Sequence, residues 1–168
     1  HVSEAYKVAD EIAASGYPAS IISLDSFGGK VEAKDFSNTN GAVLEKAGAL
    51  VGIHTDDYVT DSRLFLRSAA FAVREGMSRE KALEAITLSN AKMMRLEDRI
   101  GSLKKGKDAD LVILSGDPFS VYTQVLETWI EGVKVWDRSN PEDKIVATGG
   151  YGVFRLNTHT HTHEGGNE

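Results

Sequence analysis

Up to residue 94, the sequence alternates between segments with helical periodicity and short apolar runs. Strand-like apolar runs cover residues 19–24 and 49–54, and each lies between helical patterns. Alternating strands and helices are typical of βα units, whose strands pair in parallel. The sequence therefore predicts an α/β fold with a parallel sheet. The expected helices lie at residues 3–14, 42–47, 61–76, 78–86 and 87–94.

The ends of these helical patterns carry typical capping residues. Serine, threonine and aspartate cap a helix start because their side-chain oxygens accept bonds from backbone N–H groups. Glycine ends a helix because it adopts the left-handed conformation without strain. The expected caps are Ser3, Thr60 or Asp61, and Ser78 at helix starts, and Gly16, Gly48 and Gly76 at helix ends.

The pattern changes beyond residue 98. A turn-rich connector over residues 99–106 leads into a continuous apolar strand at 109–114. Residues 127–136 have the pattern of a β-hairpin with its turn at Glu131-Gly132. We expect these strands to form a β-layer separate from the parallel sheet. The chain becomes polar from Ser139 onward, which predicts a flexible tail.

Composition and charge exclude several classes of protein and of site. With 41% hydrophobic and 26% charged residues over 168 positions, the chain has the composition of a soluble globular protein. Its net charge of −6 argues against a nucleic-acid partner, since phosphate binding needs a basic face. No apolar run approaches the roughly 18 residues of a membrane span. The lack of cysteine excludes disulfides and thiolate metal ligands, and the localisation stays open.

The polar stretch His54-Thr55-Asp56-Asp57 directly follows the apolar run at 49–53. An imidazole and two carboxylates therefore stand at the carboxyl end of a predicted buried strand, where parallel α/β barrels carry their active sites. Because side chains alternate along a strand, His54 and Asp56 are expected to share one face. Such a pair suits a divalent metal ion. The plainer alternative is an aspartate that only caps the following loop and helix.

Three stretches carry a resemblance to one known family. Residues 52–57 (Gly-Ile-His-Thr-Asp-Asp) are similar to its eighth barrel strand, and residues 87–92 are similar to its T-x-N-x-A helix. Residues 98–114 are similar to its D-R-x-G-S-L-x-x-G-K-D-A-D-L-V pattern, which is highly specific. Over roughly residues 1–138, the chain resembles the C-terminal part of a metal-dependent amidohydrolase of the imidazolonepropionase-like branch.

The resemblance implies a (β/α)8 TIM barrel joined to a small β-sandwich that is made from both chain ends. It implies that residues 1–97 are the barrel units six to eight, residues 98–138 a portion of the sandwich, and residues 139–168 a flexible polar tail. Two predicted parallel strands cannot close a barrel that typically takes about 250 residues. We therefore expect a longer polypeptide, or a separate chain, to supply the N-terminal barrel half.

The resemblance also implies a set of site residues. Asp56 matches an aspartate that contacts the metal and accepts a proton from the attacking water, and His1 matches a metal-binding histidine of the sixth strand. The expected cofactor is a divalent metal, one or two zinc ions. Asp57 is an adjacent rival of Asp56. Expected substrate contacts are His54, Lys30, Asn40 and Arg63. The structural alternatives are a buried histidine for the first of these, a solvated loop for the next two, and a surface salt bridge for the arginine.

Three hypotheses of function follow. The first is a metal-dependent hydrolase of C–N bonds, acting on an amide or cyclic amide of a small-molecule substrate, of which this fragment alone is inactive. The second is a non-catalytic partner or regulatory module that keeps the fold, against which the intact Asp56 argues. The third is a truncated product without activity. A homo-oligomer is compatible with each of them.

Overall fold

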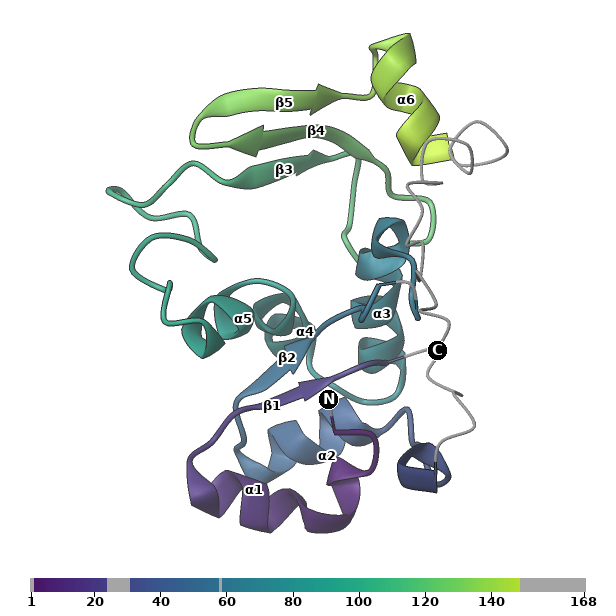
Figure 1. Ribbon diagram of the computed structural model, residues 1–168, viewed down its shortest axis with the longest axis vertical. Coiled ribbons are helices and arrows are strands. Elements are labelled where there is room, and N and C mark those ends of the chain that lie inside the picture. Colours follow the sequence, from purple (N-terminus) through teal and green to yellow (C-terminus); the bar gives the residue numbers. More distant parts are fainter. Residues whose placement is uncertain (1, 24–30, 58, 149–168) are drawn as a thin grey trace, which may run out of the picture.

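The computed structural model describes residues 2–23, 31–57 and 59–148 as a mixed α/β structure (Figure 1). A two-stranded parallel sheet lies among helices, and a three-stranded antiparallel sheet lies at the other end of the molecule. Within these described ranges, no helix is long and apolar enough to cross a membrane.

The parallel sheet consists of β1 (Ala19–Ile21) and β2 (Val51–Ile53), paired so that Ser20 lies opposite Gly52. All three residues of β2 are buried, as expected from their apolar sequence. The predicted parallel sheet is confirmed. The strand β2 is shorter than the predicted 49–54, because the backbone turns soon after its last residue.

One face of the parallel sheet is covered by α1 (Ala9–Ser15) and α2 (Asn40–Ala47) (Figure 1). The short 3-10 helix η1 (Ala5–Val8) precedes α1, so the predicted single helix at 3–14 is divided. Gly16 and Gly48 end the two helices with φ of 70° and 85°, in the left-handed region that favours glycine. The predicted C-caps at Gly16 and Gly48 are therefore confirmed, and Gly76, with φ of 106°, follows the last residues of the third helix with a predicted glycine end.

Further helical segments surround the sheet, and α5 (Leu88–Met93) lies on the face opposite α2. Because side chains alternate along β2, Gly52 faces the other way from its two neighbours, and it faces Asn90 of α5. The segments are η2 (Val31–Ala33), η3 (Ser62–Leu64), α3 (Phe65–Arg74), α4 (Arg79–Ala85) and α5 (Leu88–Met93).

Two of the three predicted N-caps are confirmed. The Asp61 carboxylate accepts a hydrogen bond of 2.9 Å from the backbone N–H of Arg63, at the start of η3. The Ser78 hydroxyl oxygen accepts one of 3.3 Å from the backbone N–H of Lys81, at the start of α4. The prediction for Ser3 was wrong, because η1 begins after a residue whose side chain makes no capping bond.

The core between the parallel sheet and its helices contains many alanines, which let the helices approach the strands closely. In α4, Ala82 and Ala85 are fully buried, three positions apart on one face. Leu83, which lies between them in the sequence, is 45% exposed. The buried core residues are Ala5, Ala9, Ala19, Ile21, Leu44, Val51, Ile53, Ala69, Ala72, Met77, Ala82 and Ala85.

The turn-rich connector that follows α5 is fastened by one lysine. The Lys107 ammonium donates hydrogen bonds to the carbonyl oxygen of Glu97, to that of Ile100 at 3.2 Å and to the Ser102 hydroxyl at 2.7 Å. These acceptors lie on successive turns of the connector. The Lys107 ammonium therefore ties three points of the connector together.

Replacing Lys107 with methionine is expected to lower the free energy of unfolding by about 2–3 kcal/mol, because the partly buried acceptors lose a charged donor. Methionine keeps the unbranched aliphatic stem, so the change isolates the ammonium. Urea denaturation measures the difference, and Lys104→Met, at an exposed position of the same connector, is the matched control. Equal stability of both variants would contradict this role of Lys107.

The antiparallel sheet joins β3 (Leu111–Leu114), β4 (Val125–Ile130) and β5 (Val133–Asp137) in that order. The predicted hairpin is confirmed, since β4 and β5 are joined at Glu131-Gly132 with positive φ values of 50° and 76°. The predicted separate β-layer is confirmed as well (Figure 1).

A further helix, α6 (Pro141–Thr148), lies beside β5 in a region predicted to be a flexible tail. The Trp136 indole N–H donates to the carbonyl oxygen of Asp143 at 2.9 Å, and the Asp143 carboxylate accepts from the backbone N–H of Asp137 at 2.9 Å. Residues 141–148 therefore form a helix with contacts to β5, where the sequence predicted a flexible tail. The rest of the predicted tail, at 149–168, lies outside the described residues.

Candidate functional site

The carboxyl end of β2 places His54 beside β1. The backbone N–H of His54 donates to the carbonyl oxygen of Ile21 at 3.0 Å, which extends the pairing one residue past Ile53. The Nδ1 atom of His54 lies 2.7 Å from the hydroxyl oxygen of Ser20. The imidazole is thus held at the strand end by a neighbouring strand, as expected for a residue that lines a site there.

A tight turn places Asp56. Its φ is 48°, in the left-handed region that aspartate tolerates better than most residues. The carbonyl oxygens of Thr55 and Asp56 accept backbone hydrogen bonds from Thr60 at 3.1 Å and from Val59 at 2.8 Å. His54 and Asp56 were predicted to share a face because side chains alternate along a strand. That reason was wrong, because β2 ends at Ile53, before both residues.

The two adjacent aspartates have different surroundings. The Asp57 carboxylate accepts a hydrogen bond of 2.6 Å from the Ser62 hydroxyl, which ties it to the start of η3. Asp56 is exposed at the turn and close enough to His54 that its charge raises the imidazole pKa. The local geometry thus gives Asp57 a capping role and leaves Asp56 beside the histidine.

Burial lowers the pKa of His54 below its ordinary value of 6.5, and the Asp56 charge offsets only part of this shift. We expect an NMR titration to find a pKa below 6.5 and a neutral imidazole at pH 7. Between the folded pKa and 6.5 the unfolded chain binds a proton that the folded chain does not, so stability rises with pH and the contribution of His54 is complete above pH 6.5. That contribution is lost as the pH falls toward the folded pKa. A titration midpoint above 6.5 would contradict the effect of burial.

Asn40 makes a different set of contacts from those expected for a substrate ligand. The residue is buried, with an exposed fraction of 2%. Its Oδ1 accepts from the backbone N–H of Tyr6 at 2.8 Å, and its Nδ2 donates to the carbonyl oxygens of Val2 at 3.3 Å and Ser3 at 2.7 Å. Asn40 therefore fixes the segment that follows His1. Its predicted contact with substrate remains a prediction.

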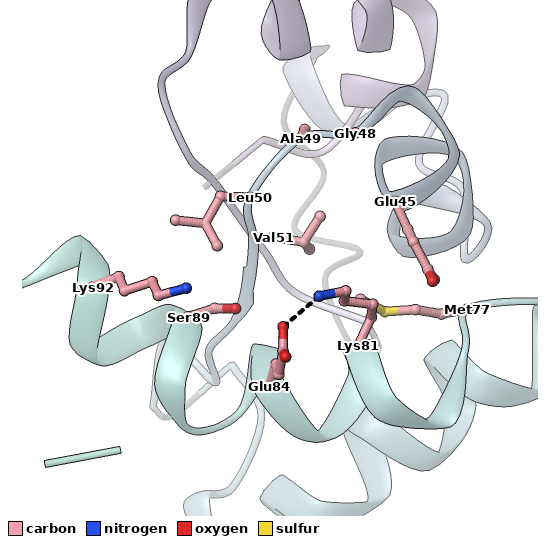
Figure 2. A pocket seen from close by; sticks show the side chains of 10 residues that line it. All are labelled: Glu45, Gly48, Ala49, Leu50, Val51, Met77, Lys81, Glu84, Ser89 and Lys92. Atoms are coloured by element: carbon pink, nitrogen blue, oxygen red, sulfur yellow. Dashed lines mark hydrogen bonds and ion pairs between the residues drawn. The ribbon is translucent and has the colours of Figure 1, made fainter. Parts of the chain in front are cut away.

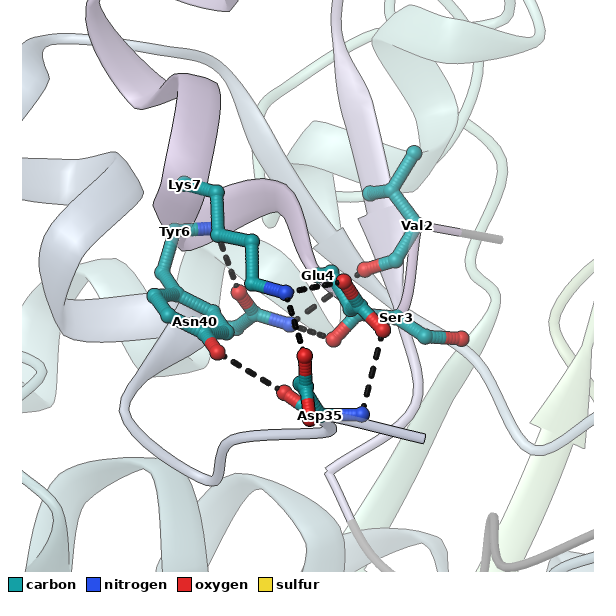
Figure 3. Close-up of polar contacts among 7 residues, drawn as sticks. All are labelled: Val2, Ser3, Glu4, Tyr6, Lys7, Asp35 and Asn40. Carbon is teal, nitrogen blue, oxygen red and sulfur yellow. Dashed lines mark hydrogen bonds and ion pairs between the residues drawn. The ribbon is translucent and has the colours of Figure 1, made fainter. Parts of the chain in front are cut away.

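Charged groups surround this asparagine (Figure 3). The Lys7 ammonium donates to the Asp35 carboxylate at 2.7 Å and to that of Glu4 at 2.5 Å, and the Tyr6 hydroxyl donates to the Asp35 carbonyl oxygen at 2.9 Å. The hydrogen bond from Lys7 lowers the pKa of Glu4. The network joins η1 to the segment that leads into α2.

Arg63 forms a close ion pair with Asp61, two residues earlier in the chain, which lowers the pKa of that carboxyl. Together with Arg67 and Arg138 it also lines a hollow of about 700 Å³ between α3, β4 and α6. Neither His54 nor Asp56 lines this hollow. The ion pair that was the structural alternative for Arg63 is present, and its contact with substrate stays a prediction.

A second hollow, of about 230 Å³, lies at the amino end of β2 (Figure 2), and His54 is not among the residues that line it. Leu50 and Val51 form part of its wall, and Lys81 and Glu84 pair across 2.7 Å at its edge. Active sites of parallel barrels lie at the carboxyl ends of the strands. This hollow is therefore not an extension of the candidate site.

Complete metal coordination is not present in the part of the chain that the structure describes. Within residues 2–23, 31–57 and 59–148, no three histidine, cysteine, aspartate or glutamate side chains are grouped to hold an ion. His54 and Asp56 offer donors of the type that zinc accepts, whereas a zinc site needs three or four ligands. These two side chains therefore fit as part of the ligand set of a metal site. His1 and Lys30, the other predicted ligand and substrate contact, lie outside the described residues.

Two residues of the site escaped the sequence predictions. Ser20, which contacts His54, follows no motif and is brought there only by the parallel register of β1 and β2. Asn90 donates a hydrogen bond of 2.9 Å from Nδ2 to the carbonyl oxygen of Ile53, directly before His54. Its position in the T-x-N-x-A-like stretch was a signal for the helix and not for this contact.

Comparison with known proteins identifies the family. A model described as the amidohydrolase family matches residues 9–136. The imidazolonepropionase of Picrophilus torridus is 26% identical over 130 residues, which cover 73% of this chain and 31% of that protein. An amidohydrolase structure from Thermotoga maritima MSB8 is 39% identical, with a TM-score of 0.77, over 81% of this chain and 36% of that chain.

A zinc-bound structure described as an adenosine deaminase from Xanthomonas campestris shares the fold at 21% identity and a TM-score of 0.58, over 80% of this chain and 35% of that chain. The chain thus spans 31%, 36% and 35% of the lengths of these proteins. The family match covers well over half of the sequence, and the protein belongs to the amidohydrolase family.

Proposed function

We propose that this chain is the C-terminal part of a metal-dependent hydrolase that cleaves a C–N bond in a small amide, cyclic amide or similar substrate. The observation that carries the proposal is the position of His54 and Asp56 at the carboxyl end of a buried parallel strand, in a chain of the amidohydrolase family. The imidazolonepropionase and the adenosine deaminase among its relatives support the same class of bond.

We further propose that β1 and β2 are the seventh and eighth strands of a TIM barrel, within a barrel part at residues 1–97. The strands β3 to β5 belong to a β-sandwich part at residues 98–138, followed by a C-terminal region at 139–168. The parallel pairing of β1 with β2 and the separate antiparallel sheet support this division. The N-terminal barrel half then supplies the strands that lie beside the open edges of β1 and β2.

In this proposal Asp56 is the base of the reaction. Its carboxylate is exposed beside His54, so a water molecule can reach it and transfer a proton to an oxygen of the side chain. The neutral His54 imidazole, positioned by Ser20, contacts the substrate. One or two zinc ions, when bound, lower the pKa of water and polarise the scissile carbonyl or imine. Asp56 and His1 are their proposed ligands from this chain.

A substrate panel tests the proposal on the full-length protein loaded with zinc. The panel contains imidazolonepropionate, adenosine, a hydantoin-type cyclic amide and an N-acyl amino acid, followed by absorbance and by release of ammonia or amine. We expect hydrolysis of at least one compound, abolished by a metal chelator and restored by zinc. A folded, zinc-treated protein that hydrolyses none of these classes would favour the non-catalytic alternative.

A further inference from the structure

We propose that Asn90 is a positioning residue for the site at the carboxyl end of β2, an inference that rests on the proposed function of that site. Asn90 belongs to α5, and its Nδ2 donates a hydrogen bond of 2.9 Å to the carbonyl oxygen of Ile53. Ile53 is the last residue of the strand and is fully buried. His54 follows it directly and Asp56 two residues later, so this bond holds the peptide group from which both side chains are aimed.

Gly52 makes the close approach of Asn90 possible. A Cβ atom on Gly52 would lie 2.2 Å from Oδ1 of Asn90 and 2.8 Å from the terminal methyl carbon of Met93. Both distances are shorter than van der Waals contact, so the space beside β2 is filled by the α5 side chains. The asparagine amide is therefore packed against the strand and has little freedom to turn.

The peptide group between Ile53 and His54 is held from two sides. Its N–H donates to Ile21 of β1 at 3.0 Å, and its carbonyl oxygen accepts from Asn90 of α5. The Ser20 hydroxyl adds a third contact, to the imidazole. The turn that carries Asp56 begins at the next residues. A shift of this peptide plane would therefore rotate both functional side chains.

The connector fixes α5 in turn. A Cβ atom on Gly101 would lie 2.7 Å from the Cβ of Ala91 and 3.0 Å from the Cα of Leu88, so the connector packs directly on α5. This contact gives Asn90 a rigid support. The T-x-N-x-A pattern has asparagine two residues after threonine, whereas Asn90 stands three residues after Thr87, so the resemblance did not imply this role.

The test uses the full-length protein with two substitutions of Asn90. Asn90→Leu keeps a similar volume and loses the donor, and Asn90→Asp keeps the shape but, as a carboxylate, cannot donate to the carbonyl oxygen. Lys92→Ala, at an exposed position of the same helix, is the control. Within these 168 residues Ile53-His54 is the only Ile-His pair, so ¹³C-carbonyl isoleucine combined with ¹⁵N-histidine gives one signal from this part of the protein. Ile53→Val confirms the assignment of its signal.

We expect both Asn90 variants to shift the Ile53 carbonyl signal and to lower kcat by about 10- to 100-fold with little change in KM, because the reacting groups are misaligned. Lys92→Ala should change neither. An active wild type whose Asn90 variants keep the wild-type kcat would overturn the positioning role alone. A wild type without hydrolysis would overturn the proposed function and the positioning role with it. If Asn90→Leu fails to fold, the kcat of Asn90→Asp tests the positioning role.

Discussion

Replacing Asp56 with asparagine is expected to reduce kcat for C–N hydrolysis by about 10²- to 10⁴-fold, because the amide cannot accept a proton from the attacking water. The variant should fold normally. Asp56 is exposed and has φ of 48°, a conformation that asparagine also tolerates. Steady-state kinetics on the substrate found in the panel, together with the thermal unfolding midpoint, separates a chemical effect from a loss of structure.

Asp57→Asn is the matched control for this prediction. The hydrogen bond from the Ser62 hydroxyl to Asp57 persists in the variant, since the asparagine carbonyl oxygen can accept it. We expect kcat close to that of the wild type. Loss of activity in Asp57→Asn with activity retained in Asp56→Asn would transfer the role of base to Asp57.

Replacing Asn40 with leucine is expected to lower the free energy of unfolding by about 3 kcal/mol or more. The buried amide satisfies the N–H of Tyr6 and the carbonyl oxygens of Val2 and Ser3, and leucine can pair with none of them. Each backbone group left buried without a hydrogen bond adds a desolvation penalty. Urea denaturation monitored by circular dichroism measures the change.

Asn38→Leu, at an exposed position two residues earlier, is the control and should leave the stability nearly unchanged. The experiment also decides between the two interpretations of Asn40. A direct contact with substrate predicts a higher KM at unchanged stability. Loss of stability in Asn40→Leu alone supports the clamp on the segment after His1.

The parts of the fold that were predicted correctly depend on local chemistry. Gly16, Gly48, Asp61 and Ser78 end or begin helices through their own backbone conformation or side-chain oxygen, so a single sequence is enough to place them. The helix α6 was missed because its first turn is polar and its contacts to Trp136 and Asp137 are tertiary. Pro141 at its first position was the available signal.

The site was predictable only in part for the same reason. The apolar run before His54 located the strand end, but the direction of Asp56 depends on a turn closed by bonds from Val59 and Thr60. Asn40 stands at a position that the resemblance connects with substrate, and its actual neighbours come from residues 34 to 38 positions earlier. Contacts of such long range depend on how the helices pack, which periodicity does not specify.

The most direct test of the account is zinc analysis of the purified full-length protein, with the intact mass measured on the same sample. The proposed function predicts a chain of more than about 350 residues, enough for a barrel of about 250 residues and a sandwich, with zinc close to stoichiometric. A mass near 18.2 kDa without bound metal would contradict it, because this chain would then lack the strands and ligands that complete the proposed site.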